Sequence, residues 1–291
     1  MAVDESVCDE KSCKVCSRPM KAQFTQLVLH RHQVTYFQCD SCGFVQTETP
    51  YWLDEAYVSA IANEDTGILV RNAAIARKVS ALIHLCFAPG DVYLDSAGGY
   101  GILTRLMRDV GFDFYWHDDY CENLFASGFG RDSMPSAPAA VTAFEVLEHV
   151  EDPVSFLAEA LDATTNRTII LSTELFQGRA PRPDDWWYYV PDTGQHISFY
   201  QRRTLEEIAR RLSVRLYSNN DIHVFTAQPI DARKFRLATG RMSWPLSLWL
   251  RTRMTSKTFS DHYQAAQNKG VVRTEGVDRP EGARPRVASG T

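Results

Sequence analysis

Four of the seven cysteines have the spacing of a metal site. They form two Cys-x-x-Cys pairs with 22 residues between the pairs: Cys13, Cys16, Cys39 and Cys42. Thiolates at this spacing bind Zn²⁺ in a closed tetrahedral site. Strand patterns at 24–30 and 34–38 lie between the pairs, so residues 1–50 are predicted to form a zinc ribbon. The ion would stabilise this small module, either as a staple alone or also to help recognise substrate.

A second group combines carboxylates with imidazole. Glu145, Glu148 and His149 follow a strand pattern at 139–144, and a helical turn would gather them on one side. In one interpretation His149 is a general base that Glu145 or Glu148 orients. In another, the three residues bind a divalent ion such as Mg²⁺, with His196 as a fourth ligand, and the ion lowers the pKa of a substrate hydroxyl. In a third, Glu145 only contacts a cofactor through water and His149 caps the next helix.

Between these two groups, a strand, a glycine-rich turn and a helix predict a nucleotide-type site. A helical pattern over 66–87 precedes the strand at 91–95, and another helix is expected over 102–110. Such a turn brings backbone close to a ligand at the carboxyl edge of a parallel sheet. The residues of this turn are Asp95, Ala97, Gly98, Gly99, Tyr100 and Gly101. The next strand, 112–117, ends in Asp118 and Asp119, where a carboxylate is placed to accept both hydroxyls of a ribose.

The spacing D-x-A-x-G-x-G lacks the pyrophosphate pattern G-x-G-x-x-G and resembles the class I S-adenosylmethionine-dependent methyltransferases. The string FEVLEHVEDP at 144–153 is similar to strings in ubiquinone-type O-methyltransferases. Its E-x-x-E-H group is similar to the metal site of those enzymes and of the small-RNA 3′-terminal 2′-O-methyltransferases. The resemblance covers about residues 65–228 and departs at Ala97, where the family has its first glycine.

The resemblance implies a set of cofactor contacts. Residues 95–101 would hold the methionine and ribose of S-adenosylmethionine, and Asp118 or Asp119 would bind the ribose hydroxyls. Tyr120 would lie close to the adenine, and Phe144 and Glu145 would border the same cleft from the fourth strand. In related enzymes a histidine followed by an apolar and aromatic stretch returns to the mouth of the active site, which makes His196 a further catalytic candidate.

The order of elements predicts an α/β fold. Alternating strands and helices that end in a strand pair near 214–217 and 222–227 favour a doubly wound, seven-stranded, mostly parallel sheet beside the zinc ribbon. The third strand is poorly marked, because 124–138 is rich in Gly, Ser, Ala and Pro. The methyltransferase domain is expected over 51–230, a basic and aromatic extension over 231–263, and a disordered tail over 264–291.

An insertion at 173–201 is a candidate segment for binding the methyl acceptor. A segment of this length is typical of a functional lid, and its aromatic residues either stack on an acceptor or pack the insertion onto the domain. A zinc module ahead of such a domain resembles the sugar methyltransferases, which implies O- or C-methylation of a small molecule, sugar or polysaccharide. The alternatives are an RNA-modifying methyltransferase and a non-catalytic S-adenosylmethionine-binding partner subunit.

Charge divides the chain. Residues 1–229 carry 19 basic against 31 acidic side chains, which argues against nucleic-acid binding by the main domain without excluding it. Residues 230–291 carry 12 basic against 5 acidic side chains.

The stretch 234–254 mixes tryptophan, leucine and arginine, so it either contacts an anionic membrane surface weakly or packs back on the domain. No run reaches the ~18 to 20 apolar residues of a spanning helix. The charged first twenty residues are unlike a signal peptide, so we expect a cytoplasmic protein. The sequence does not indicate an oligomeric state.

Overall fold

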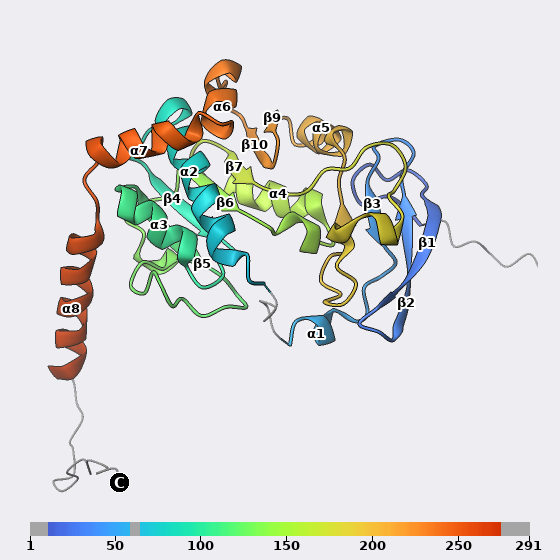
Figure 1. The fold of residues 1–291 in the computed structure, drawn as a ribbon, viewed down its shortest axis with the longest axis horizontal. Helices are drawn as coiled ribbons and strands as arrows, with labels where there is room; N and C mark the ends of the chain where they lie inside the picture. Colours follow the sequence, from blue (N-terminus) through green and yellow to red (C-terminus); the bar gives the residue numbers. More distant parts are fainter. Residues whose placement is uncertain (1–10, 59–64, 275–291) are drawn as a thin grey trace, which may run out of the picture.

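The computed structural model describes residues 11–58 and 65–274, with side chains up to 266, and contains two sheets (Figure 1). The larger sheet has the strand order β5-β4-β6-β7-β10-β9. Its parallel strands are β4 (Val92–Ser96), β5 (Asp113–His117), β6 (Ala140–Ala143) and β7 (Thr168–Leu171). The pair β9 (Arg215–Asn219) and β10 (Ile222–Thr226) is antiparallel and closes one edge.

Helices cover both faces of this sheet, so the doubly wound fold class is confirmed. On one face, α2 (Ile68–Cys86) and α3 (Ile102–Val110) pack with apolar residues of β4 and β5. On the other face, α4 (Pro153–Asp162) and α5 (Arg202–Arg211) pack on β4, β6 and β7. Helix α4 begins as its sequence indicates, because Asp152 accepts a hydrogen bond from the Ser155 N–H (3.1 Å).

The predicted count of seven strands is wrong for the described residues, which contain six in this sheet. The expected third strand is reduced to one parallel bridge between Trp116 and Gly130, followed by a 3₁₀ turn, η1 (Arg131–Ser133). The glycines and prolines of 124–138 explain the loss, because neither residue type supports a continuous strand.

The smaller sheet belongs to the cysteine module. Strands β1 (Lys21–Val28) and β2 (His32–Gln38) form an antiparallel hairpin, and β3 (Val45–Thr47) pairs with β2. The fourth strand, β8 (Ser198–Phe199), comes from the insertion and pairs with β3. A segment more than 150 residues later in the chain therefore completes the sheet of the N-terminal module. Residues 1–10 of the expected ribbon lie outside the described residues.

The four cysteines of the two pairs converge at one end of this sheet. Their sulfur atoms lie within 4.8 Å of one another. The Sγ–Sγ distances are 3.5 Å for Cys13–Cys42 and 3.4 Å for Cys16–Cys39. Four sulfurs at 2.3 Å from a central Zn²⁺ would be separated by about 3.8 Å, so the group fits a tetrahedral zinc site with a small expansion.

Both cysteine pairs are shaped by a tight turn. The N–H groups of Ser17 (φ +61°) and Gly43 (φ +79°) donate to the carbonyls of Cys13 and Cys39. The left-handed φ of Gly43 favours glycine, and a side chain there would also displace the Arg203 side chain, whose Nε it would approach to 2.5 Å.

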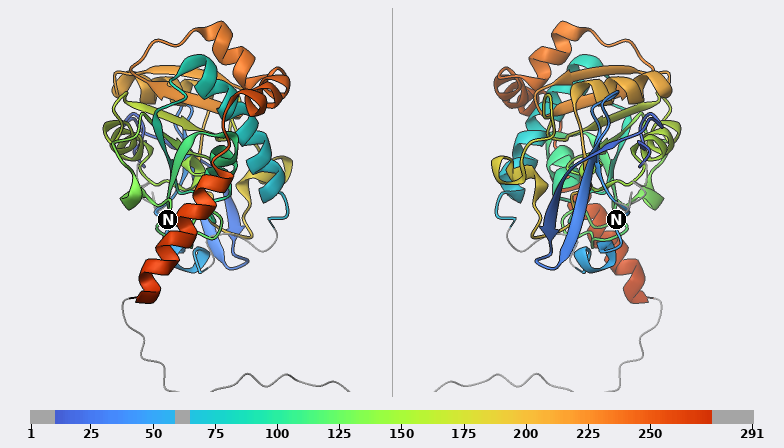
Figure 2. Two further views of the ribbon diagram at one scale, coloured as in Figure 1. Left: turned by 90° about the vertical axis from the view of Figure 1, so that its left-hand side faces the viewer. Right: turned by 90° about the vertical axis from the view of Figure 1, so that its right-hand side faces the viewer.

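Three helices follow the large sheet: α6 (Ala232–Thr239), α7 (Ser243–Arg253) and α8 (Thr258–Thr274). The expected disorder from residue 264 is wrong for 264–274, which belong to α8, while 275–291 lie outside the described residues. Helix α8 projects from the body (Figure 2) but is anchored at its first turn. There Asp261 accepts two hydrogen bonds of 2.8 Å from the buried guanidinium of Arg108. None of the helices in the described ranges has the length and apolar character needed to cross a membrane.

The cysteine geometry gives a prediction about stability. The purified chain should hold about one zinc ion, and Cys39→Ser should lose it and lower Tm by at least about 5 °C, at about 2–4 °C for each kcal/mol of lost stability. Elemental analysis and thermal unfolding measure both effects. Cys121→Ser is the matched control, because Cys121 lies outside the cluster. Full zinc content in Cys39→Ser would contradict the assignment.

Candidate active site

The turn after β4 has a backbone path that favours small residues. Ala97, Gly99 and Gly101 have left-handed φ angles of +53°, +54° and +83°. A side chain at Gly98 would meet Trp116 Cδ1 at 2.8 Å, so this position is restricted to glycine. Ala97 keeps the glycine-type path that the family pattern requires, at a strain cost of roughly 1–2 kcal/mol for a left-handed L-residue.

Asp95, at the end of β4, helps to hold the start of this turn in place. Its buried carboxylate accepts hydrogen bonds from Thr142 Oγ1 (2.7 Å) and Thr104 Oγ1 (3.2 Å). Burial raises the pKa of Asp95 to about 7. The two hydroxyls tie the end of β4 to β6 and to α3, which holds the start of the turn in place.

Asp118 is the acidic residue that reaches the glycine turn. Its Oδ2 accepts from the Gly99 N–H (2.8 Å), and its Oδ1 accepts from the N–H groups of Tyr120 (2.8 Å) and Cys121 (2.9 Å). The side chain of Asp119 is exposed. Of the two predicted ribose ligands, the structure therefore brings Asp118 to the turn.

The remaining predicted cofactor residues differ in their surroundings. Tyr100 and Phe144 are half-buried, and Phe144 packs against the core on the α2 side. Tyr120 is exposed and stacks on Tyr57 with a ring-centroid distance of 5.4 Å. The predicted residues thus lie along the carboxyl ends of β4, β5 and β6, which are neighbours in the sheet.

Glu148 lies in the 3₁₀ turn η2 (Leu147–His149) that follows β6, and it is fully buried. Within the described residues, neither of its carboxylate oxygens has a hydrogen-bond partner. Burial, and secondarily the charge of Glu145, raises the pKa of Glu148 to about 8. At this pKa the side chain is mostly protonated near pH 7, and the hydroxyls of Tyr188 and Thr173 partly offset the cost of its ionisation.

Two histidine rings lie beside this carboxylate. The rings of His149 and His196 are perpendicular, with centroids 4.8 Å apart. The Nδ1 atoms lie 3.2 Å from Gln195 O and 2.7 Å from Tyr188 O, respectively. Because a carbonyl only accepts, each Nδ1 carries the proton and each Nε2 keeps a lone pair. Burial lowers the pKa of His149 to about 3, with the charge of His196 contributing, and burial lowers the pKa of His196 to about 4.

The ligand atoms of Glu148, His149 and His196 lie within 4.8 Å of one another, and Glu145 is not part of this group. Glu145 has a left-handed φ of +55°, and its Oε1 accepts from Ser172 Oγ (2.6 Å). The turn becomes helical only at Leu147. The expected one-sided turn of Glu145, Glu148 and His149 is therefore not formed, and His196 takes the place of Glu145.

Backbone hydrogen bonds fix the position of the two histidine segments. The Ile197 N–H donates to Glu148 O (2.9 Å), and Ser198 Oγ donates to Val150 O (2.7 Å). On the other side, the Thr47 N–H donates to Ile197 O (3.1 Å). The segment around β8 thus connects η2 to the cysteine module.

Tyr57 is a site residue that the sequence analysis missed. Its hydroxyl lies 3.1 Å from His149 Nδ1, and its ring contacts both His149 and Tyr120. Tyr57 lies 92 residues before His149, in a segment with no motif, so only the folded structure associates the two residues.

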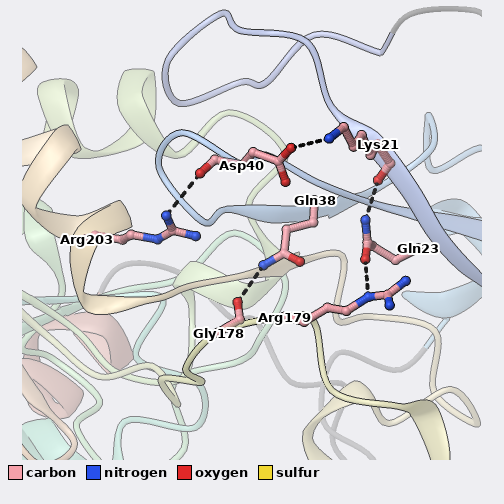
Figure 3. Close-up of a pocket in the computed structure, with 7 residues that line it drawn as sticks. All are labelled: Lys21, Gln23, Gln38, Asp40, Gly178, Arg179 and Arg203. Carbon is pink, nitrogen blue, oxygen red and sulfur yellow. Dashed lines mark hydrogen bonds and ion pairs between the residues drawn. The ribbon is translucent and has the colours of Figure 1, made fainter.

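Two cavities border the cysteine module. One of about 370 Å³ is lined by strand, insertion and helix residues, which Figure 3 shows: Lys21, Gln23, Gln38, Asp40, Gly178, Arg179 and Arg203. A second, of about 530 Å³, lies next to Cys16 and Cys42. Neither cavity includes the Glu148 group. Both are lined by polar and charged side chains and share Arg203.

One family model and several solved structures are similar to this chain. Residues 71–216 match the family model described as a methyltransferase domain. No curated protein matches the chain. Solved structures of similar fold include magnesium protoporphyrin IX methyltransferase from Synechocystis PCC 6803, with TM-score 0.39 and 12% identity over 60% of this chain and 93% of that chain. Another is an O-methyltransferase family 2 protein from Planctomyces limnophilus, with TM-score 0.41 and 13% identity over 59% and 64%. The family match spans half of the chain, and the chain therefore belongs to the methyltransferase-domain family, as a class I S-adenosylmethionine-dependent methyltransferase.

Proposed function

We propose that this enzyme methylates a hydroxyl oxygen, or a carbon, of a small molecule, sugar or polysaccharide. The observation that carries the proposal is the unpartnered carboxylate of Glu148 beside two neutral imidazoles. This group follows β6, and β6 is the neighbour of β4, whose end begins the glycine turn. Parallel strands end at the same edge, so an acceptor held at Glu148 lies next to a donor held at the turn.

The glycine turn and Asp118 are the residues that would hold the donor. Gly98 and its neighbours let the backbone approach the ligand closely, and Asp118 would exchange its bonds to backbone N–H groups for the two ribose hydroxyls. When bound, S-adenosylmethionine supplies a methyl group on a positively charged sulfur. Asp95 keeps the turn in position, and the enzyme's main task is to align the acceptor atom with that methyl group.

Glu148, His149 and His196 would hold a divalent cation. One carboxylate and two imidazoles with free Nε2 lone pairs offer three donors to such an ion, and the carboxylate offsets one of its two charges. The imidazoles favour Fe²⁺ or Zn²⁺ over the Mg²⁺ suggested by the sequence pattern. When bound, the ion would lower the pKa of an acceptor hydroxyl. Tyr57, Gln195 and Tyr188 orient the two rings.

The insertion supports a sugar acceptor. Trp186, Tyr188 and Tyr189 pack with Phe199 in the core of the module, so most of its aromatic residues have a packing role. Trp187 contacts the Tyr188 ring but is otherwise exposed, and its indole could stack on a sugar ring. The polar cavity of about 370 Å³ beside the insertion is suited to the hydroxyls of a longer glycan.

Donor binding is predicted to depend on Asp118. Asp118→Ala should weaken binding of S-adenosylmethionine and S-adenosylhomocysteine at least tenfold, or about 1.4 kcal/mol, because the ribose loses its acceptor. Isothermal titration of the zinc-loaded chain measures this effect. Asp119→Ala is the matched control and should bind as the parent does. An equal loss in both variants, or in neither, would be inconsistent with the assignment.

Binding of the divalent ion is predicted to depend on residues that donor binding does not need. In zinc-loaded protein that has been desalted to remove weakly bound divalent ions and then supplied with Mn²⁺, Glu148→Gln and His196→Ala should each weaken Mn²⁺ binding at least tenfold, as seen by electron paramagnetic resonance. Their affinity for S-adenosylmethionine should stay within about twofold of the parent. Without the divalent ion, Glu148→Gln should also raise Tm near pH 7, because the pKa of Glu148, raised from 4.5 to about 8, favours the unfolded state at this pH and Gln has no such penalty. Full activity of zinc-loaded protein without an added divalent ion, together with loss of activity in His149→Ala, would favour the general-base interpretation instead.

The reaction itself is tested with radiolabelled donor. The enzyme with Mn²⁺ should transfer label to sugar nucleotides or glycans, and a deletion strain should accumulate a glycan or metabolite lacking one CH₂ unit. His196→Ala should abolish transfer while it still binds donor. Transfer to an RNA pool alone, or donor binding without transfer to any pool, would exclude the proposed acceptor class.

A further inference from the structure

The C-terminal helices carry a concentration of positive charge that the methyltransfer site does not use. From residue 232 to 260 the chain has seven basic side chains and no acidic one: Arg233, Lys234, Arg236, Arg241, Arg251, Arg253 and Lys257. The remainder of the chain has 24 basic and 36 acidic side chains. The positive stretch coincides with α6, α7 and the link to α8, which lie away from the cysteine module (Figure 1).

Helix α7 has one face fixed to the body and one largely exposed face, on which the Trp249 ring contacts His84 of α2 (ring centroids 5.3 Å apart). Ser243, Ser247 and Leu250 are buried, and Leu250 packs with Ile75 and other core residues of α2. This contact fixes which side of the helix points outward. Pro245 lies in the first turn, where its missing N–H is not needed, so it does not interrupt α7.

The outward face is apolar to an unusual degree. Trp244 is 59% exposed, Leu248 47%, Met242 48% and Trp249 44%, and Leu237 of α6 adds a further apolar side chain at 41%. Arg253 lies over the Trp249 ring at 5.7 Å. Large apolar side chains alternate here with arginines that are all exposed. We call Leu237, Met242, Trp244, Leu248 and Trp249 with the surrounding cations the α6–α7 face.

We propose that the α6–α7 face binds the surface of an anionic lipid bilayer, with α7 lying in the plane of the interface. Interfacial helices typically carry tryptophan and leucine on one face, with arginine or lysine beside them, and α7 has this composition. Anionic headgroups attract each nearby Lys or Arg side chain. Lys257 is paired with Asp113, but the six basic side chains from 233 to 253 form no salt bridge within the described residues, so a negative surface would attract this end of an acidic protein. Leucine and methionine gain nothing from stacking on bases, which favours lipid over RNA as the occupant.

This proposal does not depend on the methyl acceptor. It places the enzyme reversibly at a membrane, because one amphipathic helix gives weak and salt-sensitive binding. The helix is held to the body by its buried face, so only the outward side chains enter the headgroup region.

Vesicle binding by the full, zinc-loaded chain tests the proposal. Sucrose-loaded vesicles of phosphatidylcholine with one quarter phosphatidylglycerol should bind the protein at least about tenfold more tightly than vesicles of phosphatidylcholine alone, and added salt should weaken the binding. Tryptophan emission should shift to the blue on binding. Equal affinity for the two vesicle types would overturn the proposal.

Variants separate the face from the rest of the surface. Trp244→Ser with Leu248→Ser should reduce binding to anionic vesicles at least about tenfold, and Arg251→Gln with Arg253→Gln should reduce it by a similar factor. Leu27→Ser, whose parent side chain is 41% exposed on β1, and Arg202→Gln on α5 are the matched controls and should bind normally. All positions are exposed, so Tm should stay unchanged. If the parent self-associates without binding vesicles, and the double serine variant does not self-associate, the face is instead a contact between two copies. Retention of RNA without vesicle binding would also overturn the proposal.

Discussion

The pairing of β8 with β3 is the interaction on which the candidate active site depends. This pairing joins Val45 to Phe199 and Gln46 to Ser198, and His196 lies directly before it. On the opposite side, the Ile197 N–H reaches the carbonyl of Glu148. A two-residue strand has little stability of its own, so the position of His196 relative to Glu148 depends on the sheet that β8 joins.

The cysteine module therefore forms one wall of the catalytic domain. Cys13, Cys39 and Phe44 belong to the same core cluster as Leu205 and Ile208 of α5. Several side-chain bonds add to this contact: Gln38 bonds to the backbone of Gly178 and Ala180, and Thr204 Oγ1 donates to Cys42 O. A zinc ion at the four cysteines would stabilise β3, and through β8 it would hold His196 in place. This arrangement favours a structural role for the module, in which its stability determines the position of His196.

Local patterns predicted the elements that carry the candidate site, and long-range contacts determined how they meet. The cysteine pairs, the glycine turn after β4 and the capped start of α4 depend on residues close in sequence, so spacing alone identified them. Spacing could not show that Glu145 adopts a left-handed φ and turns to Ser172, because that choice depends on β7. The contact of Tyr57 with His149 spans 92 residues, for which one sequence carries no signal. The proximity of His196 to Glu148 and His149 was suggested by the resemblance to related enzymes and not by residue spacing. Helix α8 was missed because its anchor, the Arg108–Asp261 pair, is also a long-range contact.

Hydrogen exchange measured by mass spectrometry is the most direct test of the link between the cysteine module and the active site. We expect chelation of zinc to remove protection from the amides of 45–47 and of 197–200 together, while the amides of β4 and β6 keep theirs. Unchanged protection of 197–200 in zinc-free protein would contradict the link, because His196 would then be held without the module.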